Sequence, residues 1–142
     1  MSWTFPYELF PEADRTETVA ILDRAFKRIE NPERFTQKEY ARDAEGNYVR
    51  VHDDKAVCWC SYGALDIEKS RRPSLLGEHK AASMFMRRAS AFVWNNAPNY
   101  LKGTRDSKQK VAVVDVNDVL GHEYALRMLG RAIALAKGQD EN

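Results

Sequence analysis

Three stretches of the chain repeat apolar residues at intervals of three and four, which is the spacing of one face of an α-helix. Asp14 and Glu17 stand at capping-box spacing ahead of the first stretch. Pro32 follows the first stretch and Gly138 follows the third, and both residue types commonly stop helices. Three such faces must be buried together, so the sequence predicts a helical core. The stretches are residues 15–29 (Val19, Leu22, Phe26, Ile29), 81–93 (Ala81, Phe85, Ala89, Phe92, Val93) and 125–136 (Ala125, Leu129, Ala132, Ile133, Ala136).

Shorter elements are predicted between these stretches. Residues 55–68 predict a fourth helix that Asp53 or Asp54 can cap. Turn residues at 43–47, with apolar residues after them, predict a short hairpin within residues 40–51. Residues 111–116, four of which are the β-branched residue valine, predict one further strand that could pair with the hairpin. The expected fold is therefore α+β and helix-dominated, with about four helices, a short hairpin and one further strand.

A chain of 142 residues with 44% hydrophobic residues can form one core without covalent staples, so we expect a single domain over residues 1–142. Residues 1–13 are rich in aromatic side chains and are expected to pack on the domain as an irregular arm, whereas residues 139–142 should fray. No run approaches the roughly 18 apolar residues that cross a bilayer, and the start lacks the pattern of a secretory signal. We therefore expect a cytoplasmic protein without a membrane partner.

The chain holds two cysteines, Cys58 and Cys60, and three histidines. Cysteines separated by one residue are too close for an ordinary disulfide. Neither the cysteines nor the histidines have the spacing of a metal or redox motif. We expect reduced thiols, no metal and no cofactor.

Charge is segregated along the chain, although the net charge is only +1. Residues 69–110 hold ten lysines and arginines against two acidic residues, and the flanking parts are acidic. This basic segment could attract an anionic ligand, an acidic protein or nucleic acid, or it could pair internally with the acidic flanks. The aromatic residues typical of nucleic-acid sites are sparse in it. Its candidate contacts are Arg71, Arg72, Arg87, Arg88, Lys102, Arg105, Lys108 and Lys110.

Two pairs of segments resemble a known family. Residues 40–49 and 56–65 resemble the motifs ARD..G..V and AV.WC..GAL of the bacterial and phage proteins grouped as domain of unknown function 6197. Residues 116–126 and 130–136 resemble the motifs ND...H and RAI.LA of the same family. The family name carries no activity, and the phage association implies an inhibitor or ligand-sequestering role. Residues 68–110 depart from the resemblance and look like an insertion.

The motifs place a thiol, an imidazole, a carboxamide and a carboxylate in one domain. Cys60 matches the motif cysteine. As a nucleophile it would need His122 as a base, and Asn117 or Asp118 to orient the imidazole. Cys60 also falls on the predicted apolar face, which favours a buried core thiol. Asn117 and Asp118 could instead cap the last helix.

The interpretation that we favour is a small binding protein, rather than an enzyme, that recognises an anionic ligand or a macromolecular partner. Arg42 could face an anion or hold the hairpin turn, and Trp59 could stack on a ligand or lie in the core. Two rival hypotheses are a hydrolase or transferase that depends on Cys60 and His122, and a nucleic-acid-binding protein that uses the basic segment. Nothing in the sequence indicates an oligomeric state. The candidate ligand-binding residues are Arg42, Trp59, Asn117, Asp118, His122, Arg87 and Arg88.

Overall fold

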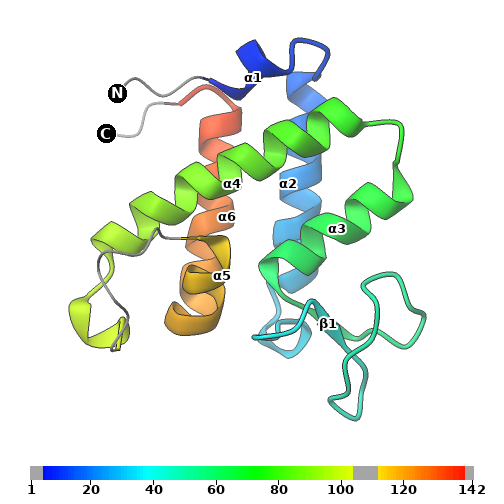
Figure 1. Cartoon of the computed structure of the whole chain (residues 1–142), viewed down its shortest axis with the longest axis vertical. Helices are drawn as coiled ribbons and strands as arrows, with labels where there is room; N and C mark the ends of the chain where they lie inside the picture. The colour runs from blue at the N-terminus through cyan, green and yellow to red at the C-terminus, as the bar shows by residue number, and fades with distance from the viewer. Residues whose placement is uncertain (1–4, 104–111, 140–142) are drawn as a thin grey trace.

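The structure is a computed structural model that describes residues 5–103 and 112–139. Within these ranges, four long helices build the fold: α2 (Arg15–Ile29), α3 (Ser61–Arg71), α4 (Leu76–Asn96) and α6 (His122–Ala136). Helix α4 crosses α2 and α6, and α3 packs beside α2 (Figure 1). A two-stranded antiparallel sheet, β1 (Ala41–Arg42) with β2 (Cys58–Trp59), lies at the start of α3. The chain is a helix-dominated α+β single domain.

The three helices predicted from apolar spacing are confirmed. Helix α2 begins where the sequence predicts, because the Asp14 carboxylate accepts a hydrogen bond from the backbone N–H of Glu17 at 2.8 Å. Helix α6 ends ahead of Gly138, whose φ of +86° is the left-handed conformation that terminates helices. The core that these helices share includes Ile21, Leu22, Ala25, Phe85, Met86, Ala89, Met128, Leu129 and Ala132.

The strand predicted over residues 111–116 is wrong in the part that the structure describes, and residue 111 lies outside it. Residues 113–115 form the short helix α5 (Val113–Asp115), which continues into one turn of π-helix, η3 (Val116–Leu120). The carboxylate of Asp115 accepts a hydrogen bond from the backbone N–H of Ala112 at 2.8 Å and caps this start. Val113 and Val116 are fully buried. Their packing against other helices overrides the β-propensity of the segment.

The helix predicted over residues 55–68 begins only at Ser61, because the residues before it join the sheet. Cys58 belongs to β2, and Cys60 is the N-cap of α3. The expectation that both cysteines lie on one helix is therefore wrong. Burial of Trp59 in β2 and the pairing of its backbone with β1 stabilise the extended conformation.

The turn predicted at residues 43–47 is present. The backbone N–H of Asp43 donates to the carbonyl of Asn47 at 2.9 Å, and Arg42 forms an antiparallel bridge with Tyr48. The main partner of β1 is nevertheless β2, not the segment that follows the turn. The sheet thus links the loop before β1 to the start of α3.

The aromatic arm, described from Phe5 onward, includes the short helix α1 (Pro6–Leu9). The rings of Phe5 and Tyr7 lie 5.4 and 5.3 Å from the ring of Phe85 in α4. The Tyr7 hydroxyl donates to the carbonyl of Ala136 at 2.9 Å. The arm therefore joins α4 to the end of α6.

Residues 69–110 supply α4 to the core, so the segment that looks like an insertion is an integral layer of this fold. The described residues also form two short 3₁₀ turns, η1 (Pro32–Arg34) and η2 (Asn99–Leu101). Arg105, Lys108 and Lys110 of the basic segment lie outside the described residues, as do residues 1–4 and 140–142. Every helix in the described ranges is too short or too polar to cross a membrane.

Candidate functional site

The two motif segments meet at the start of α3. The side-chain oxygen of Asn117, in η3, accepts hydrogen bonds from the backbone N–H and the hydroxyl of Ser61 at 2.9 and 2.8 Å. Its amide nitrogen donates to the carbonyl of Thr36 at 3.2 Å and to Oδ1 of Asp118 at 2.8 Å. Asn117 is 2% exposed, and these bonds use the full hydrogen-bonding capacity of its amide. Asn117 therefore ties three chain segments together.

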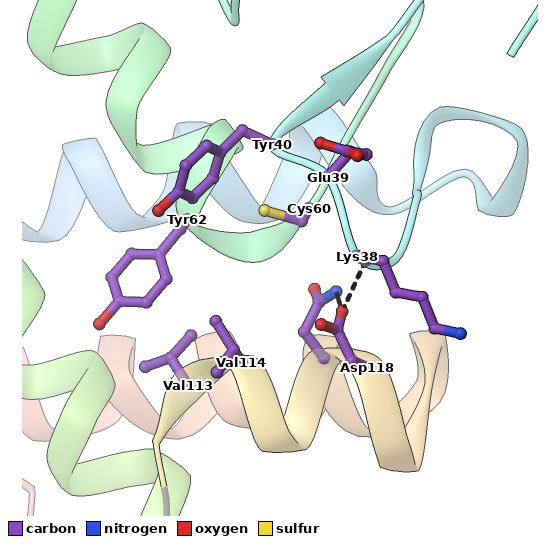
Figure 2. A pocket seen from close by; sticks show the side chains of 9 residues that line it. Lys38, Glu39, Tyr40, Cys60, Tyr62, Val113, Val114 and Asp118 are labelled. Atoms are coloured by element: carbon purple, nitrogen blue, oxygen red, sulfur yellow. Dashed lines mark hydrogen bonds between the residues drawn. The ribbon is translucent and has the colours of Figure 1, made fainter. Parts of the chain in front are cut away.

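A pocket of about 240 Å³ opens beside this junction (Figure 2). We call it the tyrosine pocket. The rings of Tyr40 and Tyr62 and the sulfur of Cys60 lie on one side of it, and Val113 and Val114 lie on the other. The remaining lining residues are polar or charged: Lys38, Glu39, Asn117 and Asp118.

The thiol of Cys60 is protonated at neutral pH. Its sulfur accepts a hydrogen bond from the backbone N–H of Gly63 at 3.2 Å, and burial raises the pKa of the Cys60 thiol to about 11. His122 lies elsewhere: its Nε2–H donates to the carbonyl of Ile29 at 2.7 Å, and its ring packs against Phe35. The thiol–imidazole contact that a Cys60 nucleophile would need is not formed.

A second concavity, of about 480 Å³, is formed by α2, η1 and α3. We call it the basic pocket. Sequence reasoning nominated only two of its cations, because the others belong to the acidic first part of the chain. The i, i+3 and i+4 spacing of the three cations in α2 could have revealed them, since such residues share one helical face. The lining residues are Arg24, Lys27, Arg28, Arg34, Glu68, Arg71 and Arg72.

Glu68 is the single carboxylate of the basic pocket, and it is 1% exposed. Its Oε2 accepts hydrogen bonds from Nε of Arg24 and Nη1 of Arg72, both at 2.8 Å. Nη2 of Arg28 lies 3.6 Å from the other carboxylate oxygen. Three guanidinium groups thus offset one buried negative charge, which would otherwise be costly to bury.

Positive charge in the basic pocket exceeds what Glu68 neutralises. Lys27 has its own partner in Asp23 at 3.0 Å, but Arg34 and Arg71 form no ion pair within the part of the chain that the structure describes. Burial, followed by the positive charge of Arg71, lowers the pKa of Arg28. Nη2 of Arg24 and Nε of Arg28 are buried donors without a hydrogen-bond partner. The pocket therefore presents positive charge that Glu68 and Asp23 do not balance.

The motif resemblance agrees with the comparison against family models. The model of the Family of unknown function (DUF6197) matches residues 13–135. The chain belongs to this family. The matched range contains every lining residue of both pockets as well as α4. Comparison with curated proteins and with solved structures gave no match.

Two further motif residues of this DUF6197 protein hold its loops in place. Arg42 donates through Nε to the hydroxyl of Thr36, through Nη1 to the carbonyl of Gly46 and through Nη2 to the carbonyl of Gln37, at 2.9, 2.9 and 3.2 Å. Trp59 is 8% exposed, and its indole N–H donates to the carbonyl of Val51 at 2.9 Å. These contacts favour the turn and core interpretations of both residues over ligand contact.

The candidate arginines of α4 lie apart from the motif junction. Arg87 is exposed and lines a different concavity, with Asp66, His79 and Lys80 among its neighbours, and Arg88 is half-buried. The structure therefore brings together Cys60, Asn117 and Asp118 at the tyrosine pocket, whose lining includes neither His122 nor the arginines of α4. Among the described residues, no three His, Cys, Asp or Glu side chains gather as they would around a metal ion.

Proposed function

We propose that this DUF6197 protein is a small binding protein that recognises an anionic ligand, free or displayed by a macromolecular partner, through the basic pocket. The observation that carries the proposal is the surplus of positive charge around Glu68. Three guanidinium groups are enough to bury one carboxylate, yet the pocket adds Arg34 and Arg71, which no carboxylate of the described residues neutralises.

The electrostatics of the pocket favour an anion. Two like charges 4 Å apart near a protein surface repel by roughly 4 kcal/mol at an effective dielectric constant near 20, so clustered guanidinium groups carry a cost that a bound anion removes. An anion in the pocket would pair with the guanidinium groups of Arg34 and Arg71, which have no carboxylate partner among the described residues. Guanidinium forks bind phosphate and carboxylate groups in a bidentate manner.

The chemistry of the lining favours binding over turnover. Only arginine, lysine and glutamate side chains line the basic pocket, and its one carboxylate is held by three arginines. Such a pocket suits a ligand-sequestering or inhibitory role. We place the protein in the cytoplasm, because Cys58 and Cys60 are both free thiols.

Titration of the full chain with inorganic phosphate and with pyrophosphate, followed by calorimetry, tests the proposal. We expect saturable binding that weakens by about tenfold in the double variant Arg34→Gln/Arg71→Gln, because two charge-assisted contacts are lost. The matched control is Arg127→Gln, which removes an exposed arginine of α6 outside the pocket and should bind like the wild type. Equal affinity of the double variant and the wild type would contradict the proposal.

A salt series separates this function from nucleic-acid binding. A single-stranded oligonucleotide held by the basic segment should lose affinity steeply with salt, because its binding releases counterions. If the oligonucleotide binds with that slope and the double variant retains its affinity, the nucleic-acid hypothesis replaces the one proposed here.

A further inference from the structure

We propose that the tyrosine pocket is a second ligand site, which takes a small aromatic ring that bears a cationic amine. It is separate from the basic pocket, and no residue lines both. The inference therefore does not rest on the proposed function. Three observations support it: the residues that line the pocket, the polar groups that remain available to a ligand, and the backbone conformations around the pocket.

The walls of the pocket suit an aromatic ring. The rings of Tyr40 and Tyr62 face the side chains of Val113 and Val114 across the opening (Figure 2). Tyr40 and Val114 keep 49% and 45% of their surface exposed, so the mouth itself is apolar. A ring placed between these walls would bury apolar surface, and its contacts with the tyrosine rings would add to that burial.

The inner polar groups have little left to offer a ligand. All four hydrogen-bonding positions of the Asn117 amide are occupied within the protein. The Cys60 thiol is neutral, and its sulfur already accepts a hydrogen bond from the N–H of Gly63. Recognition of a polar ligand group therefore falls to the charged residues of the pocket.

The charged residues favour a cation. Asp118 and Glu39 contribute carboxylates, whereas the ammonium group of Lys38 extends away from the pocket in Figure 2. Oδ1 of Asp118 accepts hydrogen bonds from the backbone N–H of Lys38 at 2.9 Å and from Asn117 at 2.8 Å, which fixes the carboxylate in place. Its second oxygen accepts no hydrogen bond from the described residues and is available to an ammonium group.

Unusual backbone conformations surround this pocket. Lys38 is the one non-glycine residue of the described chain with a positive φ, at +71°. The opposite wall runs into the π-helical turn η3, a rare element that occurs often at functional sites. Such conformations persist only where the surroundings fix them, and they cluster at ligand sites. Here the hydrogen bond from Lys38 to Asp118 connects the two walls.

The two pockets thus have opposite charge preferences, and matched probes can tell them apart. 2-Phenylethylamine and phenylacetate share one aromatic ring and differ in the sign of their charge. We expect the amine to bind with a Kd of about 1 mM or tighter, which corresponds to about −4 kcal/mol. Phenylacetate should bind to the tyrosine pocket at least about tenfold more weakly, because it faces two carboxylates.

Protein-detected NMR titration of the full chain with each probe is the experiment. Val114→Trp fills the pocket from an exposed position and should abolish binding of the amine, whereas Val119→Trp, which is also exposed but lies outside the pocket, should leave it intact. Asp118→Asn keeps an acceptor for Lys38 and should weaken amine binding about fivefold through loss of the charge.

Three results would overturn the inference: no saturable binding of the amine, equal binding of phenylacetate at the tyrosine pocket, or an unchanged affinity in Val114→Trp. The Arg34→Gln/Arg71→Gln variant should bind the amine like the wild type. Failure of the amine site and failure of the anion site are therefore distinguished by separate probes and separate variants.

Discussion

The side-chain oxygen of Asn117 accepts hydrogen bonds from both the backbone N–H and the hydroxyl of Ser61, at 2.9 and 2.8 Å. The two residues are 56 positions apart and both are buried. Their contact joins the motif segment 116–126 to the start of α3, which lies within the motif segment 56–65. The side chains of Asn117 and Ser61 thus hold together two of the segments that form the tyrosine pocket.

Removing this contact should destabilise the fold. In Asn117→Ala, the N–H and hydroxyl of Ser61 lose their acceptor inside the protein, and we expect the free energy of unfolding to fall by roughly 3 kcal/mol. Urea denaturation measures the effect. Asn95→Ala, at an exposed position of α4, should change it by less than about 0.5 kcal/mol. Similar losses in the two variants would show that the junction contributes little.

Gly63 should tolerate no side chain. A Cβ atom there would overlap the carbonyl oxygen of Tyr40, which is backbone and cannot rotate away. We expect Gly63→Ala to lower the free energy of unfolding by roughly 2 kcal/mol or more. Gly130 in α6 has open space around it, so Gly130→Ala should raise that free energy by roughly 0.5–1 kcal/mol. Thermal unfolding compares the pair, and a Gly63→Ala protein as stable as the wild type would refute the close contact.

Neutralising Glu68 should expose the repulsion within the basic pocket. Glu68→Gln leaves Arg24, Arg28 and Arg72 without their counter-charge, and we expect a loss of roughly 3 kcal/mol in the free energy of unfolding. Phosphate should recover more stability in the variant than in the wild type, because it replaces the missing negative charge. Thermal shift with and without phosphate measures both effects.

The control for this variant is Glu123→Gln. Glu123 forms an exposed ion pair with Arg127 on α6, and such pairs contribute less than about 1 kcal/mol. Phosphate should affect this control as it affects the wild type. A Glu68→Gln protein that behaves like the control would contradict the role assigned to the buried carboxylate.

Alkaline pH should weaken the fold through Cys60. Burial raises the pKa of its thiol from 9.0 to about 11, so the folded state keeps the proton at pH values where the unfolded chain has lost it. The stabilisation is complete below the unfolded value and is lost as the pH rises through about 11. A difference of two pKa units corresponds to roughly 2–3 kcal/mol.

Urea denaturation of the wild type and of Cys60→Ala between about pH 8 and pH 11 measures this contribution, as the difference between their free energies of unfolding at each pH. That difference should fall as the pH rises. Cys58→Ala is the matched control and should follow the wild type. Parallel curves for Cys60→Ala and the wild type would show that the thiol has an ordinary pKa.

Local sequence signals predicted the helices well and the short extended segments poorly. The cap at Asp14 and the stop at Gly138 are properties of neighbouring residues, so α2 and α6 are readable from the chain. The β-branched residues around Val113 indicated a strand, but their burial among helices made them helical. Cys58 lies in a strand because β1, sixteen residues earlier, supplies its partner.

The sequence by itself determined the helix-dominated α+β class, the family and the two stretches that meet near Cys60 and Asn117. Only the tertiary structure decided what those residues do. Asn117 is hydrogen-bonded to Ser61 and Thr36, and His122 is hydrogen-bonded to Ile29. These partners are distant in the sequence, so no local pattern reveals the bonds. The basic pocket likewise exists because α2, η1 and α3 pack together, which brings cations of the acidic first part of the chain beside Arg71 and Arg72 of the basic segment.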